Sequence, residues 1–181
     1  MDFNIYTFNE FHSICNLPIY KIEKLNKKLL NLIPIQIKLL LINEGSLTKN
    51  VEYLSGKITK IFTMQKENRK SKINIRCVWL ETSIYTRLIF ARSLWCIIYK
   101  NTMGKENNID KPIGKLYIKH QVDIYKDIHE IYYGYCQNIE KCYQTQIKNT
   151  PMWGRKYSLY YENESYIIIQ EFFSPYIINL F

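Results

Sequence analysis

The residue best suited to chemistry is a carboxylate inside an apolar run near the end of the chain. Glu171 lies in the segment Tyr166–Pro175, between three isoleucines and two phenylalanines. Such a run predicts a buried strand. Burying a charge without a partner costs roughly 2–7 kcal/mol or more, so Glu171 requires a cation or a chemical role. The nearest upstream cation of the right kind is Arg155. On this residue alone, a salt bridge without chemistry is the simpler interpretation.

The arginines are informative because the chain has so few of them. The composition is rich in Ile, Asn, Lys and Tyr, with Ala91 as the only alanine, as an AT-rich coding sequence would produce. Where drift toward lysine is easy, a retained arginine suggests a need for its planar fork, which grips a carboxylate in two places. Surface retention by chance is favoured for Arg69 and Arg87. Arg76 opens a strand-like run, and Arg92 interrupts another. The full set of arginines is Arg69, Arg76, Arg87, Arg92 and Arg155.

Charge and cysteine usage exclude several classes of protein. The net charge is +9, but the lysines are spread along the chain and no block of five like charges occurs, which argues against a nucleic-acid binder. The remaining charge is compatible with a small anionic ligand. Five scattered cysteines without a C-x-x-C pair predict neither a metal site nor a redox motif. The apolar stretch Leu29–Ile42 is interrupted and too short for a membrane span, so a soluble protein is expected.

Hydrophobic periodicity predicts a single α+β domain over residues 1–181. Apolar residues at helical spacing predict a helix over Ile22–Leu32, a second helix from Pro34 to about Asn43, and a short amphipathic piece after a polar turn at residues 45–50. Alternation predicts strands over residues 57–64, 73–81 and 87–99, and a closing hairpin of residues 156–161 and 166–173. Residues 124–132 fit either a strand or a helix. Helices first and antiparallel hairpins after indicate the α+β class.

Six segments, in order, resemble the chorismate lyase family. They are Leu39–Lys49 (a flap), Ile75–Leu80, Ala91–Ser93, Lys111–Gly114, Trp153–Leu159 and Glu171–Pro175. The chain is most similar to the chorismate-lyase-like branch of cyanobacteria and red-algal plastids. This resemblance covers about residues 29–175. It implies an antiparallel sheet of about six strands with helices and flaps on one side, and a monomer in the plastid stroma. The N-terminus shows no basic targeting segment, which suits a protein made inside the organelle.

The resemblance also implies an activity: elimination of pyruvate from chorismate to give 4-hydroxybenzoate for quinone (plastoquinone) biosynthesis, without cofactor or metal. Arg76 and Glu171 would be the catalytic residues. Arg76 would grip the ring carboxylate, and Glu171 would be the base for the ring proton or the acceptor of the hydroxyl. Removal of Glu171 is expected to abolish turnover and to leave folding intact or improved.

Further residues would hold the substrate by resemblance. The backbone of Ile113 and Gly114 would add a donor, Leu47 and Thr48 would close the pocket, and Arg155 (or the adjacent lysine) would neutralise the enolpyruvyl carboxylate. A different class remains open, because the same fold serves as a non-catalytic domain that binds small aromatic acids in transcription regulators. Such domains follow a helix-turn-helix domain, for which the N-terminal segment here is too short. A basic nucleic-acid binder is the third alternative.

Overall fold

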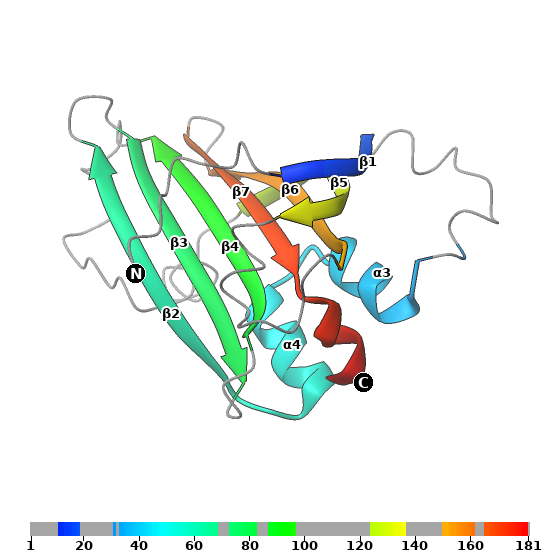
Figure 1. The fold of residues 1–181 in the computed structure, drawn as a ribbon. Coiled ribbons are helices and arrows are strands. Elements are labelled where there is room, and N and C mark those ends of the chain that lie inside the picture. Colours follow the sequence, from blue (N-terminus) through cyan, green and yellow to red (C-terminus); the bar gives the residue numbers. More distant parts are fainter. Residues whose placement is uncertain are drawn as a thin grey trace.

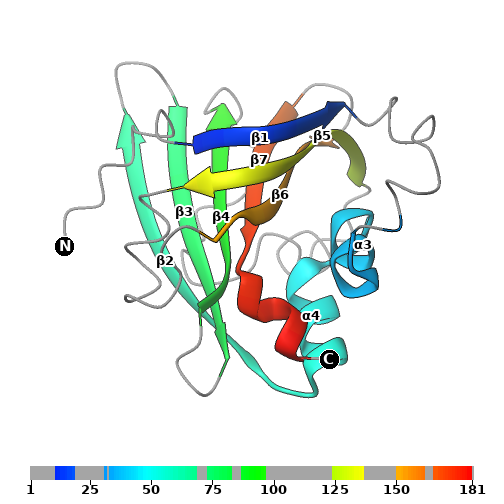
Figure 2. The same ribbon diagram turned by 45° about the vertical axis from the view of Figure 1, so that its right-hand side comes forward.

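The computed structural model describes residues 11–18, 31, 33–68, 73–82, 87–96, 124–136, 150–161 and 165–180. In these residues, seven strands form one antiparallel sheet in the order β1-β5-β6-β7-β4-β3-β2. The strands are β1 (Phe11–Pro18), β2 (Thr59–Asn68), β3 (Ile73–Thr82), β4 (Arg87–Cys96), β5 (Ile124–Cys136), β6 (Met152–Tyr161) and β7 (Ser165–Phe173). Figures 1 and 2 show that β1 and β5 cross the direction of β2, β3 and β4 steeply, as the twist of the sheet requires.

Within the described ranges, three helical elements gather at one end of the sheet, beside the ends of β4 and β7 (Figure 2). These are α3 (Ile35–Leu41), α4 (Leu47–Ser55) and the 3-10 helix η3 (Pro175–Leu180). Helix α3 begins directly after Pro34. Helix α4 ends at Ser55 and is followed by its C-cap residue Gly56, whose φ of 63° is the left-handed conformation that glycine adopts without strain. Their apolar faces form one core with the sheet, which includes Ile37, Leu40, Val51, Leu80, Ile89, Phe173 and Ile177.

The opposite face of the sheet carries an aromatic core. Tyr132, Gly154, Phe172, Phe90 and Trp79 stand opposite one another on five adjacent strands. Trp79 contacts Phe90 with ring centroids 4.7 Å apart, and Tyr132 stacks on Phe172 at 6.0 Å. Because Gly154 has no side chain, the rings of Tyr132 and Phe172 meet across it. A Cβ there would lie 2.9 Å from the Phe172 ring and 2.6 Å from the carbonyl oxygen of Glu171.

The α+β class and the antiparallel sheet are confirmed, with one strand more than the six expected. The additional strand is β1, over Phe11–Pro18, which pairs with β5 at the edge of the sheet. Residues 124–136 are a strand of 13 residues rather than a helix, and β6 begins at Met152, four residues before the predicted start. The predicted helix over Ile22–Leu32 lies almost wholly outside the described residues. None of the helices in the described ranges is long and apolar enough to cross a membrane.

Candidate active site

Two adjacent rows of the sheet bring the predicted catalytic residues to one face. In the first row, Glu171 of β7 stands between Arg155 of β6 and Ala91 of β4. In the second row, two residues along each strand, the order is Tyr157, Ile169, Ser93 and Arg76. Since side chains alternate between faces, residues two apart on a strand share a face. Both rows therefore lie on the face that carries α3 and α4.

Glu171 is held by two donors. Arg155 Nε donates to Oε2 at 2.7 Å, and the Tyr157 hydroxyl donates to Oε1 at 2.7 Å. Glu171 is 3% exposed and Arg155 is 0% exposed. Burial, followed by the negative charge of Glu171, raises the pKa of Tyr157 well above its ordinary value, so the phenol keeps its proton and remains a donor. The partnership of Arg155 with Glu171 is thus confirmed.

Arg155 also ties the carboxylate to the helical side of the molecule. Its Nη1 donates to the carbonyl oxygens of Leu41 at 3.0 Å and Asn43 at 2.8 Å. Those carbonyls lie at the C-terminal end of α3, where the backbone has unpaired acceptors and the helix dipole favours a cation. One guanidinium therefore bridges Glu171 and the segment that joins α3 to α4. Its Nη2 is buried and has no hydrogen-bond partner among the described residues.

Arg76 stands on β3, two strands away from Glu171. It is 4% exposed, and its Nη2 donates to Thr63 Oγ1 at 3.4 Å. Two strand spacings and two residues along the strands place the Cα atoms of Arg76 and Glu171 about 12 Å apart. Between them, on β4, the same face carries only Ala91 and Ser93. The two long side chains therefore stand at opposite ends of a stretch of sheet covered by two short ones.

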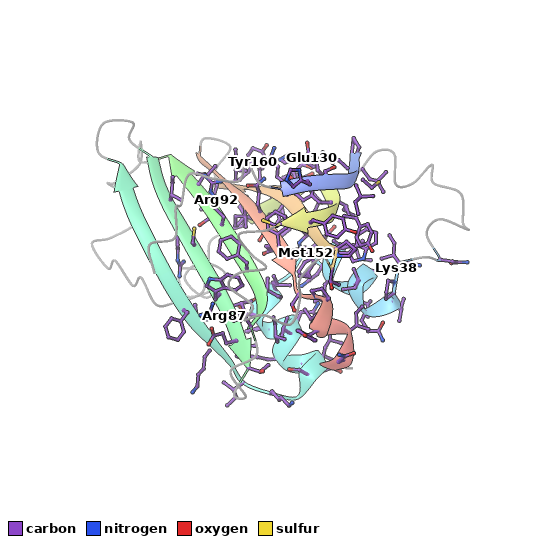
Figure 3. All side chains as sticks on the ribbon, in the orientation of Figure 1. Lys38, Arg87, Arg92, Glu130, Met152 and Tyr160 are labelled. Carbon is purple, nitrogen blue, oxygen red and sulfur yellow. The ribbon has the colours of Figure 1, made fainter. Side chains whose placement is uncertain are left out.

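Two further arginines, both on β4, lie on the face of the sheet opposite to Glu171. Arg87 is the first residue of β4, and Arg92 lies in the middle of the strand (Figure 3). Arg87 pairs with Glu81 at 2.9 Å and lies over the ring of Trp79, 5.1 Å from its centroid. The expectation of chance retention on the surface is therefore wrong for Arg87, which has two specific contacts. Neither arginine shares the face of Glu171.

The flap residues lie at the start of α4. Leu47 and Thr48 are 8% and 6% exposed, and Leu47 belongs to the core between the helices and the sheet. Ser46 is the N-cap residue, whose side chain faces the backbone N–H of Lys49 at 3.5 Å. Ile113 and Gly114 lie outside the described residues, so their predicted contacts stay predictions. The described residues contain no cluster of His, Cys, Asp or Glu able to hold a metal ion.

Sequence reasoning missed Lys126 and Asn43. Lys126 Nζ donates to the carbonyl oxygens of Asn43 at 3.2 Å and Gly45 at 3.0 Å, and lies 4.7 Å from the centroid of the Tyr157 ring. Burial, and then repulsion by Arg155, lower the pKa of Lys126 to about 8, although Glu171 and Glu44 act in the other direction. The only signal was alternation, which places Lys126 on the same face as Ile128. The contacts themselves join segments more than 80 residues apart.

Comparison with known proteins relates this arrangement to one family. The family model for "Chorismate pyruvate-lyase Rv2949c-like" matches residues 41–181. The protein ycf21 of Antithamnion sp. is 41% identical over 165 residues, covering 87% of this chain and 89% of that protein. Ycf21 of Porphyra purpurea is 38% identical over 157 residues, covering 81% and 85%.

A solved structure with the same fold is the effector domain of PhnF from Mycobacterium smegmatis. Its TM-score is 0.54 at 8% sequence identity, over 74% of this chain and 91% of that domain. At this identity the likeness concerns the fold alone. The family model covers the segment that carries Glu171, Arg155, Arg76 and both flap residues. The chain belongs to the Rv2949c-like chorismate pyruvate-lyase family.

Proposed function

We propose that this protein is a chorismate lyase that eliminates pyruvate from chorismate and leaves 4-hydroxybenzoate. The observation that carries the proposal is the placement of Arg76 and Glu171 on one face of the sheet, with only Ala91 and Ser93 between them. Family membership supports the same activity. The substrate has a ring carboxylate at one end and a ring hydroxyl at the other. Arg76 can bind the carboxylate, and Glu171, held apart from Arg76, can accept a hydrogen bond from the hydroxyl.

The arrangement suits a flat ring bound between two polar ends. Arg76 grips the ring carboxylate with its guanidinium fork, which matches a carboxylate in geometry and charge. The short side chains of Ala91 and Ser93 leave the ring room to lie against β4. Glu171 then meets the hydroxyl at the far end of the ring. A carboxylate oxygen accepts two hydrogen bonds, so the bonds from Arg155 and Tyr157 leave each oxygen of Glu171 able to accept another.

The reaction breaks the ether bond between the ring and the enolpyruvyl group. The proton on the adjacent ring carbon, which also carries the hydroxyl, leaves to a base, and the electron pair of that C–H bond completes the aromatic ring. The electron pair of the ether bond leaves with the enolpyruvate oxygen, and a proton then returns to its CH₂ carbon to give pyruvate. Glu171 is the base for the ring proton or the acceptor that orients the hydroxyl. Aromatisation drives the reaction.

The position of the site among buried residues supports catalysis by orientation in a water-excluded space. Leu47 and Thr48, at the start of α4, close the site in this proposal, so the same helix must move to release product. A product held by Arg76 and Glu171 together would leave slowly. We further propose that 4-hydroxybenzoate feeds plastoquinone synthesis and that the protein acts as a monomer in the plastid stroma. The ycf21 relatives from Antithamnion and Porphyra support this setting.

The test is to incubate the purified protein with chorismate and to follow pyruvate and 4-hydroxybenzoate by chromatography. Glu171→Gln should lower the turnover rate by about 100-fold or more, the usual contribution of a general base. Arg76→Lys should raise KM by about 10-fold or more, because a point charge does not replace the fork. Glu130→Gln and Arg92→Lys, matched changes on the other face, should stay within about twofold of the unaltered protein.

Each outcome separates the classes of function. Product formation that survives both site variants would refute the assigned roles. Tight binding of 4-hydroxybenzoate without product would favour a non-catalytic binding domain on the same fold. If neither ligand binds, Glu171 is a structural member of an ion pair and the lyase proposal fails.

A further inference from the structure

A cluster of cationic and amide donors beside Glu171 has more hydrogen-bonding capacity than the described residues use. Arg155 Nη2 and Asn43 Nδ2 are buried and have no partner in that part of the chain. The amide of Asn43 is oriented by the backbone N–H of Gly45, which donates to its Oδ1 at 2.8 Å, so the free end of the amide is a donor. Buried donors without acceptors are rare in folded proteins and indicate a bound water or ligand.

Lys126 adds a third donor to this cluster. Its ammonium group has three N–H bonds, of which two point to the carbonyl oxygens of Asn43 and Gly45. Lys126 and Arg155 both lie against the ring of Tyr157, at 4.7 and 5.0 Å from its centroid. They are therefore close neighbours, and both reach the carbonyl oxygen of Asn43, at 3.2 and 2.8 Å.

The balance of charge in this cluster favours an added anion. Lys126 lies on β5, Arg155 on β6 and Glu171 on β7, so two cations face one buried carboxylate. The charges that act on Lys126, in order of size, are the repulsion of Arg155, the attraction of Glu171 and the attraction of the exposed Glu44. Among Lys126, Arg155 and Glu171 the two cations outnumber the one carboxylate, and water screens the exposed Glu44, so a second carboxylate would balance the charge of these three groups.

We propose that Lys126, together with Arg155 Nη2 and Asn43 Nδ2, forms a subsite for the second carboxylate of a dianionic substrate, and that Lys126 determines the preference for a dianion. The inference rests on the proposed lyase function. The enolpyruvyl arm of chorismate is attached to the ring carbon next to the one with the hydroxyl. If Glu171 holds that hydroxyl, the carboxylate of the arm lies on the Glu171 side of the ring, where these donors are.

This placement changes which lysine serves the substrate. The family resemblance offered Lys156 as the alternative to Arg155. The strand partners of Lys156 are Glu130 and Gln170, and alternation places it on the face opposite to Glu171. Lys126, 29 residues upstream of Arg155, shares the face and the ring of Tyr157 instead. Lys156 therefore provides a matched control.

The experiment compares affinity for chorismate, a dianion, with affinity for 4-hydroxybenzoate, a monoanion, in four proteins: unaltered, Lys126→Met, Lys126→Arg and Lys156→Met. Affinity is measured as KM and product inhibition where there is turnover, and as Kd otherwise. Methionine keeps the length and the apolar contact with Tyr157 but removes the charge. We expect Lys126→Met to weaken chorismate about 10- to 100-fold and 4-hydroxybenzoate less than about threefold. Lys126→Arg should keep most of the preference for chorismate over 4-hydroxybenzoate, and Lys156→Met should keep all of it.

Two results would overturn the inference and leave the lyase standing. The first is unchanged affinity for chorismate in an active Lys126→Met protein. The second is an equal loss for both ligands, which would make Lys126 an anchor of the segment between α3 and α4 and no more. If the unaltered protein binds 4-hydroxybenzoate but neither binds nor converts chorismate, the proposed function fails and the subsite fails with it.

Discussion

Glu171 and Arg155 form a buried ion pair, and each charge depends on the other. The sequence correctly indicated this partner as the nearest upstream arginine, and the pairing of β6 with β7 places the two residues directly opposite each other. It did not show that Arg155 is fully buried and bonded to Leu41 and Asn43. The ion pair argues against the expectation that removing Glu171 leaves folding intact or improved, because the charge of Glu171 neutralises a second buried charge.

We predict that Glu171→Ala lowers the free energy of unfolding by about 3–5 kcal/mol, since it leaves the guanidinium of Arg155 buried without its counter-charge. Urea unfolding of the single variants and of Glu171→Ala combined with Arg155→Met measures the coupling. The double variant should lose less than the sum of the single losses, by about 0.5–3 kcal/mol. Glu81→Ala, whose partner Arg87 is 32% exposed, should cost about 1 kcal/mol or less. Additive losses at Glu171 and Arg155 would show that the pair is not coupled.

At the scale of elements, strands with strong alternation of polar and apolar residues and clear flanking turns were predicted correctly. Strands with weak local patterns were missed or misplaced. Strands β3, β4 and β7 were predicted nearly at their observed bounds. Strand β1 was missed because Phe11–Pro18 mixes polar residues with a proline and becomes a strand by pairing with β5 at the sheet edge. The predicted start of β6 was too late, because Gly154 interrupts the alternation of polar and apolar residues near the true start of the strand. The same glycine allows the rings of Tyr132 and Phe172 to stack.

We predict that Gly154→Ala damages both stability and the site. The added Cβ meets the carbonyl oxygen of Glu171 at 2.6 Å, a backbone atom that cannot rotate away, so β6 and β7 must separate locally. Overpacking of this kind costs about 1–3 kcal/mol, and displacing Glu171 should also weaken 4-hydroxybenzoate binding. Gly56→Ala is the contrast: its φ of 63° is strained for alanine, but nothing lies within 4 Å of the new Cβ. It should lower stability without changing affinity. Equal affinity in the two variants would contradict the role of Gly154.

At the scale of the whole molecule, the sheet order was beyond direct reading from the sequence. β7 lies between β6 and β4, and β5 lies between the N-terminal strand and the closing hairpin. The hydrogen bonds from Arg155 and Lys126 to the segment at the end of α3 span 81 to 114 residues. Local patterns predict which residues are buried and which face they share, but not which distant strand lies beside them. Arg76 and Glu171 were paired through family resemblance. Lys126 and Asn43 had no such guide, and only the folded chain brings them to Arg155.

The net charge of +9 has two explanations, drift of the coding sequence or attraction of an anionic ligand. We predict that it assists encounter with the substrate, because a positive protein attracts a dianion more strongly than a monoanion. Raising salt from about 0.01 to 1 M shortens the Debye length from about 30 to 3 Å. The kcat/KM for chorismate should fall with salt, and more steeply than the affinity for 4-hydroxybenzoate, while sucrose at matched osmolarity should reproduce neither change. An equal dependence on salt for chorismate and 4-hydroxybenzoate would mean that the excess of lysines results from drift of the coding sequence alone.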